Sequence, residues 1–119
     1  MVKVHIVRDK TGFIWEYTVE GHAYADEPGK DLVCAAVSAI AYTGANALEE
    51  LAGIKLKSRK GPKVLTERLG YLKCVIPYDI SEDKKNMVKV ILETVRVGFE
   101  QLKYTPSYKK YISILDEEV

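Results

Sequence analysis

The chain has 119 residues, of which 47% are hydrophobic and 29% are charged. This length suffices for one globular domain with a sizeable core and is too short for two, so we expect a single domain over residues 1–119. Lysine and arginine total 18 against 17 acidic residues, a net charge of +1. This balance gives no general case for nucleic acid or a membrane surface as a partner.

Targeting and membrane segments are not expected either. The N-terminus alternates like a strand and lacks the apolar stretch and cleavage site of a signal peptide. We find no run of about 18 apolar residues that would predict a membrane span. Two cysteines are too few for a disulfide framework. We therefore expect a cytoplasmic protein in which Cys34 and Cys74 stay reduced.

The first 20 residues predict a β-hairpin. Apolar residues alternate over 1–7, residues 9–12 have the composition of a turn, and 13–20 alternate again. The face of the second strand that we expect on the core is rich in aromatic side chains and consists of Phe13, Trp15, Tyr17 and Val19.

Two helices and three further strands follow a loop over residues 21–30. Apolar residues repeat every three or four positions from Asp31, the expected N-cap, to Gly53, and again from Ser81 to Thr105. Residues 54–58, 69–77 and 108–115 predict strands. The order β-β-α-β-β-α-β predicts an α+β fold, a mostly antiparallel sheet with two helices packed on one face. The other face would be partly bare, which favours a homodimer.

The residues with most chemical potential flank the loop before the first helix. If Asp31 caps this helix, Cys34 falls in its first turn, where unpaired amides and the helix dipole stabilise a thiolate and lower the pKa of the thiol below about 8.5. The thiolate is the nucleophilic form of cysteine. Asp31, Cys34 and Ser38 are spaced by three and four residues, so they share one stripe of the helix.

His22 stands where the loop leaves the preceding strand, and the chain must return from there to begin the helix. Its imidazole could take the proton of Cys34 and later protonate the leaving amine, with Asp31 or a backbone carbonyl orienting the ring. Amides of the first turn could stabilise an oxyanion. This arrangement is typical of a cysteine hydrolase. In the alternative interpretation none of these residues is catalytic. Cys34 is then a small core residue, His22 a surface histidine, and Asp31 an ordinary helix cap. Ser38 is then a polar residue without a chemical role.

These residues resemble a known signature. Gly21-His22-Ala23, the segment from Asp31 to Ser38 that reads DLVCAAVS, and Asn46-Ala47-Leu48 are similar to the Prp family of bacterial ribosomal-processing cysteine proteases. The close resemblance covers residues 17 to 51. It implies Cys34 as nucleophile and His22 as general base.

The resemblance also implies supporting roles for Asp31 and Ser38, a cytoplasmic homodimer, and a mobile loop over the site. The substrate would be the N-terminal extension of large-subunit ribosomal protein twenty-seven, cut after an aromatic residue. In such a loop Gly21 and Gly29 would permit backbone movement, Tyr24 could contact the peptide, and closure would exclude water.

Other sites are weaker in the sequence. The basic residues between positions 55 and 63 could contact RNA or an acidic partner, but we favour a solvated edge strand and expect no direct nucleic-acid binding. They are Lys55, Lys57, Arg59, Lys60 and Lys63. The two histidines and two cysteines lack the spacing of metal ligands, and the glycines lack that of a phosphate loop, so we expect no metal and no cofactor.

The leading hypothesis is therefore a cysteine endopeptidase acting on a ribosomal protein precursor. One alternative is a non-enzymatic ribosome-associated binding or assembly module that uses residues 55–63 and the sheet face. Another is a redox-sensing protein in which Cys34 forms a sulfenic acid without peptide turnover. Cys74, in an apolar strand, is expected to be an inert core thiol.

Overall fold

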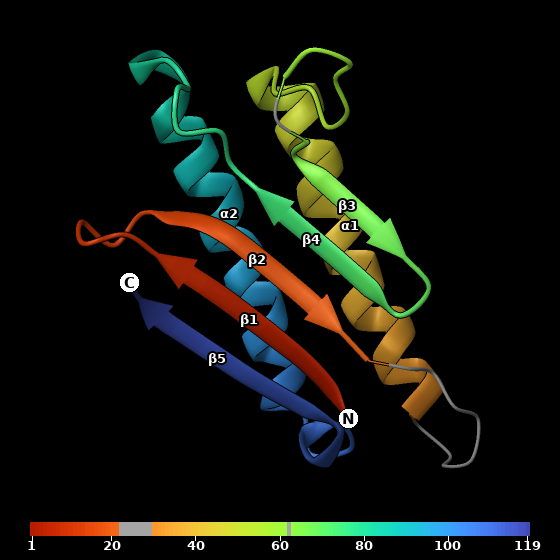
Figure 1. Cartoon of the computed structure of the whole chain (residues 1–119). Coiled ribbons are helices and arrows are strands. Elements are labelled where there is room, and N and C mark those ends of the chain that lie inside the picture. The colour runs from red at the N-terminus through yellow and green to blue at the C-terminus, as the bar shows by residue number, and fades with distance from the viewer. Residues whose placement is uncertain (22–29, 62) are drawn as a thin grey trace.

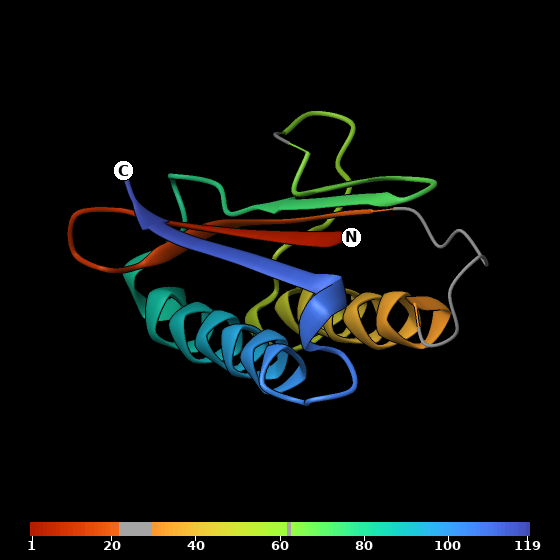
Figure 2. The same cartoon turned by 90° about the horizontal axis from the view of Figure 1, so that it is seen from below.

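The computed structural model describes residues 1–21, 30–61 and 63–119, and the side chains of Lys30 and Asp31 lie outside that description. The elements in chain order are β1 (Val2–Arg8), β2 (Ile14–Glu20), α1 (Lys30–Ala52), β3 (Leu65–Arg68), β4 (Tyr71–Val75), α2 (Glu82–Lys103), the 3-10 turn η1 (Lys109–Tyr111) and β5 (Ile112–Glu118). The strands form a sheet in the order β3-β4-β2-β1-β5. Of its pairings, β1 with β5 is parallel and the others are antiparallel. Both helices cover one face of this sheet (Figures 1 and 2), so the predicted α+β architecture is confirmed.

The N-terminal hairpin forms as predicted but contains a bulge. Val7 pairs with Glu16 whereas Arg8 pairs with Ile14, which leaves Trp15 without a partner in the register. The bulge reverses the alternation, so that Ile14 is 2% exposed while Trp15 is half-buried. The predicted aromatic face is therefore confirmed, with Tyr17 and Val19 buried and with Phe13 and Trp15 partly buried against the core.

Helix α1 provides much of the core. The residues of its buried face are each at most 1% exposed: Val33, Val37, Ala41, Ala45 and Leu48. The Tyr17 hydroxyl donates to the Ala41 carbonyl oxygen at 2.7 Å and so ties β2 to this helix. By length and composition alone, Leu32–Ala52 would also suit a membrane span, with 21 residues at a mean hydropathy of 1.3. Its packing against the sheet favours the interpretation as a core helix.

The connection from α1 to β4 differs from the prediction. Residues 54–58 do not form a strand; the strand here is β3, which turns through Leu69 and Gly70 into β4. Gly70 has φ of +74°, a conformation that favours glycine. Ile54 and Leu56 are nonetheless 5% and 8% exposed. Ile54 and Leu56 alternate with polar residues because both are buried, although the segment that carries them is irregular.

Helix α2 and β5 complete the fold. Ser81 occupies the predicted N-cap position of α2, although its side chain makes no capping hydrogen bond. β5 ends at Glu118, beyond the predicted strand, because its acidic residues are paired within the sheet. Asp116 contacts Arg8 and Glu117 contacts His5, each at 2.7 Å.

The face of the sheet opposite the helices is partly bare, as predicted, since among the described residues only the connection between α1 and β3 rises on this side (Figure 2). It is polar, because Lys3, His5 and Thr18 point away from the core between buried neighbours. Large exposed apolar side chains gather instead along a groove of about 590 Å³ between α1 and α2. They are Leu51, Met87, Val90 and Val97.

Candidate functional site

The start of α1 places Cys34 differently from the prediction. The helix begins at Lys30, so Asp31 is its second residue and not its N-cap. Cys34 is the fifth residue and lies just beyond the turn that carries unpaired amides. The prediction that Asp31 caps this helix is therefore wrong.

A pocket of about 410 Å³ opens beside Cys34. Cys34 is half-buried and Ser38 is exposed, and both line this pocket together with Gly21 at the end of β2. Cys34 also packs against the hydrophobic core. The thiol-bearing residue thus belongs to a reachable surface cavity, and the structure brings it together with Ser38 and Gly21.

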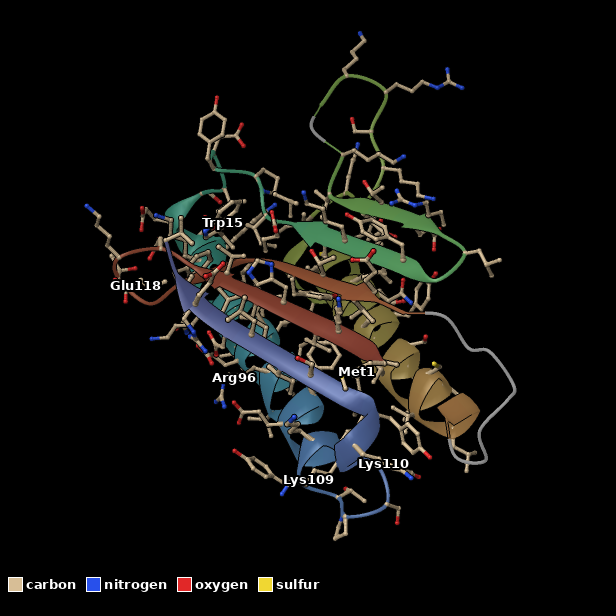
Figure 3. The ribbon with its side chains drawn as sticks, turned by 60° about the horizontal axis from the view of Figure 1, so that its bottom comes forward. Met1, Trp15, Arg96, Lys109, Lys110 and Glu118 are labelled. Atoms are coloured by element: carbon tan, nitrogen blue, oxygen red, sulfur yellow. The ribbon has the colours of Figure 1, made fainter. Side chains whose placement is uncertain are left out.

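Gly21 is held tightly at the wall of the pocket. Its amide donates to the Gly70 carbonyl oxygen at 3.0 Å. A Cβ atom at this position would lie 2.9 Å from both the Met1 carbonyl oxygen and the Val2 Cα, so the close approach requires glycine. Met1 and the beginning of α1 lie at the same end of the molecule (Figures 1 and 3). Gly21, the last described residue before the gap at 22–29, therefore lies in the wall of the pocket.

The other predicted site residues are not placed. His22, Tyr24 and Gly29 lie outside the described residues, as does the side chain of Asp31. The geometry that relates these groups to Cys34 therefore stays a prediction.

Tyr42 and Glu67, which the sequence analysis missed, form a further wall of the pocket. The Tyr42 hydroxyl donates a short hydrogen bond to the Glu67 carboxylate, and Lys57 Nζ donates to its other oxygen at 3.0 Å. The bond from Tyr42, and then that from Lys57, hold the pKa of Glu67 below its ordinary value. Tyr42 follows Ser38 by four residues, a spacing that could have indicated it. Glu67 could not be found without the pairing of β3.

The turn between β3 and β4 forms the rim. The Arg68 guanidinium lies over the Tyr71 ring, 4.0 Å from its centroid. Both residues line the pocket, together with Leu69, which is 96% exposed at the tip of the turn. The rim therefore offers aromatic and apolar surface to a ligand.

Cys74 contrasts with Cys34. It is 1% exposed on β4, and burial raises the pKa of its thiol to about 12. The predicted core position of Cys74 is confirmed, and its thiol is unsuited to nucleophilic chemistry at neutral pH.

The metal site and the basic binding segment that the sequence raised as further possibilities find little support in the structure. Within the described ranges, no group of three or more histidine, cysteine or acidic side chains is arranged to hold a metal ion. The basic segment is an irregular connection and not the predicted edge strand. Lys57 is paired with Glu67, whereas Lys55, Arg59, Lys60 and Lys63 are exposed.

Comparison with known proteins identifies relatives over nearly the whole chain. Residues 1–113 match the family described as cysteine protease Prp. Ribosomal processing cysteine protease Prp of Bacillus subtilis (strain 168) is 28% identical over 102 residues, which are 86% of this chain and 87% of that protein.

Solved structures share the fold of this chain. The crystal structure of SMU.848 from Streptococcus mutans has a TM-score of 0.78 at 27% identity and covers 100% of this chain and 96% of that one. The essential ribosomal processing protease Prp from S. aureus, in complex with a substrate peptide, has a TM-score of 0.76. At 21% identity, over 98% of this chain and 100% of that one, this second likeness shows the fold alone.

Proposed function

This chain is a member of the Prp family of cysteine proteases, and on that premise we propose that it removes the N-terminal extension of a ribosomal protein precursor. The name of the Bacillus subtilis relative supports a substrate of this class. The observation that carries the proposal is the position of Cys34, half-buried on the wall of a pocket of about 410 Å³. A peptide bound in this pocket would lie beside Cys34.

In the proposed mechanism, Cys34 Sγ attacks the carbonyl carbon of the scissile peptide bond. His22 takes the thiol proton and then gives it to the leaving amine, so that a thioester forms as the C–N bond breaks. Water hydrolyses the thioester and regenerates the Cys34 thiol. Asp31 and Ser38 are proposed to support the imidazole and the reacting groups.

We also propose, from the resemblance, that the segment with Gly21, Tyr24 and Gly29 closes over the bound peptide. Closure would exclude water while the acyl-enzyme forms, and Tyr24 would contact the peptide. The cleavage site would follow an aromatic residue, and the apolar pocket floor of Val2, Val19 and Leu72 supports this preference.

Cleavage of the candidate ribosomal precursor tests the assignment. Mass spectrometry after incubation with the wild-type protein should show loss of the N-terminal extension. Cys34→Ala and His22→Ala should abolish processing and retain the wild-type circular dichroism spectrum. Cys74→Ala, the matched control at the buried cysteine, should still process the precursor. Processing by the Cys34→Ala variant would contradict Cys34 as the nucleophile, and processing by both variants would show that the protease proposal is wrong.

A ribosome-associated binding module is the second candidate. The exposed basic residues between α1 and β3 favour it, since several of them carry no acidic partner among the described residues. Replacing Arg59, Lys60 and Lys63 by glutamine should then abolish co-sedimentation with ribosomes. This candidate prevails if co-sedimentation is lost and the wild-type protein never cleaves the precursor.

We further propose one domain over residues 1–119 that acts as a cytoplasmic homodimer. The exposed apolar side chains along the α1–α2 groove support self-association, because exposed apolar patches commonly mark interaction surfaces.

A further inference from the structure

We infer that Tyr42 and Glu67 determine part of the peptide specificity by selecting a hydrogen-bond-donating side chain three or four residues from the scissile bond. We call this pair the acceptor wall. The inference rests on the proposed function, because the ligand is that function's peptide substrate. It goes beyond that function by assigning a role to two residues outside the proposed catalytic group.

The position of the acceptor wall follows from the helix. Cys34, Ser38 and Tyr42 are spaced by four residues along α1 and line the same pocket. At about 1.5 Å of rise per residue, Tyr42 stands about 12 Å along the helix from Cys34. An extended peptide advances about 3.3 Å per residue. For a peptide that lies extended along α1, a substrate residue three or four positions from the bond attacked by Cys34 therefore reaches Tyr42.

The chemistry of the acceptor wall follows from its hydrogen bonds. The Tyr42 hydroxyl proton is used in the bond to Glu67, so the phenolic oxygen offers lone pairs. Glu67 accepts from Tyr42 and from Lys57, and these bonds keep its carboxyl ionised. An ionised carboxylate has about four lone-pair sites, so acceptor capacity is left over. The wall thus suits an amide, ammonium or guanidinium group.

The acceptor wall also separates two pockets. Tyr42 and Glu67 line both the pocket of Cys34 and a neighbouring pocket of about 330 Å³. Lys57 lines the neighbouring pocket and does not line that of Cys34. The Lys57 cation therefore approaches Glu67 from the far side. On the peptide side, the Arg68 guanidinium lies over the Tyr71 ring, and the acceptors of Tyr42 and Glu67 remain for the peptide.

Binding of matched peptides to Cys34→Ala tests the inference without requiring turnover. The peptides contain one aromatic residue that marks the cleavage site, and carry glutamine or methionine at the third or fourth position on either side of that site. Methionine has a similar length and no donor. At one of these positions we expect the glutamine peptide to bind about tenfold more tightly than the methionine peptide. Fluorescence anisotropy measures the two dissociation constants, and their ratio is the selectivity.

Variants of the acceptor wall should remove this selectivity. In the Cys34→Ala background, Glu67→Met should reduce the ratio to within about twofold, since the charged acceptor is lost. Tyr42→Phe should reduce it to an intermediate value. Glu82→Met is the matched control, because Glu82 is an exposed glutamate on α2 that is paired with Lys85 at 2.9 Å and does not line the pocket. It should keep the tenfold ratio, and circular dichroism melts should show that all variants fold.

Three results would overturn the inference: no binding by any peptide, equal binding of glutamine and methionine peptides at every position, or an unchanged ratio in Glu67→Met. A different result would separate it from the proposed function. If the wild-type protein cleaves no peptide but its Cys34→Ala variant shows the selectivity and loses it with Glu67→Met, the acceptor wall stands and the endopeptidase assignment fails.

Discussion

Cys34 and Cys74 show how position governs the chemistry of a single side chain. Cys74 packs among core residues on β4, and burial penalises its thiolate. Cys34 lies one helical turn into α1 on the wall of a pocket. The same functional group is thus protonated and protected in one place and accessible in the other.

Alkylation should distinguish the two thiols. At pH 7 we expect iodoacetamide to modify Cys34 at least about a hundredfold faster than Cys74, because the thiolate is the reactive form and Cys74 holds its proton up to a pKa of about 12. Peptide mass spectrometry after timed labelling measures both rates. In denaturant the rates should become similar. Equal rates in the folded protein would contradict the proposed nucleophile.

Cys74 should also make stability depend on alkaline pH. Its pKa of about 12 in the folded state exceeds the ordinary value, so the unfolded chain loses this proton first. The stabilisation is complete below about pH 8.5 and declines as the pH rises toward 12. Between pH 8 and 10, the free energy of unfolding measured by urea denaturation should fall by about 2 kcal/mol more in the wild-type protein than in Cys74→Ala. An equal loss in both would exclude this contribution.

At the scale of the elements, α1 approaches α2 and the sheet through small residues. A Cβ atom added at Gly44 would lie 2.4 Å from Val95 Cγ2 and 2.9 Å from the Tyr17 hydroxyl oxygen. Ala41 and Ala45 beside it are fully buried. This face of the helix therefore sets how closely α1 and α2 pack over β2.

Gly44→Ala should destabilise the protein by about 1–3 kcal/mol, because overpacking outweighs the better helix propensity of alanine, about 1 kcal/mol. The midpoint of urea denaturation measures the change. Gly61→Ala is the control, since its Cβ would meet Ser58 Oγ at an ordinary 3.5 Å. A Gly44→Ala variant as stable as the wild type would mean that the helices separate easily.

At the scale of the whole molecule, Arg8 joins elements from both ends of the chain. Its guanidinium contacts Asp116 on β5 and Glu93 on α2, each at 2.7 Å, and the Gly12 carbonyl oxygen at 3.0 Å. Hydrogen bonds to Asp116, and then to Glu93, raise the pKa of Arg8. The end of β1 is thereby connected to the last strand and to the second helix.

Arg8→Met should lower the free energy of unfolding by about 1–3 kcal/mol, because it leaves two partly buried carboxylates without this donor. Chemical denaturation at neutral pH is the measurement. Lys10→Met, at an exposed position of the same hairpin, should change stability by less than about 0.5 kcal/mol. Similar effects of the two substitutions would argue against the network.

The oligomeric state tests the α1–α2 groove. Light scattering coupled to size exclusion should give the mass of a dimer, and Val90→Glu, which puts a charge in the groove, should shift it to a monomer. Tyr78→Glu, at a residue 97% exposed outside the groove, should stay dimeric. A monomeric wild-type protein would contradict the proposed homodimer.

The sequence by itself determined the order of elements, the helix faces and the family. Strand and helix periodicities record which side chains are buried, and those patterns are local. The signature around Cys34 identified a cysteine protease of the Prp family for the same reason, since its residues lie in adjacent segments. The match over residues 1–113 confirms this membership.

Only the tertiary structure decided the parallel pairing of β1 with β5, the location of β3 and the bulge at Trp15. It alone joined Tyr42 to Glu67, which stand 25 residues apart in the chain. These features depend on which distant segments pack together, and no local period encodes that choice. The walls of the pocket therefore follow from long-range pairing, whereas the position of the proposed nucleophile in the chain does not.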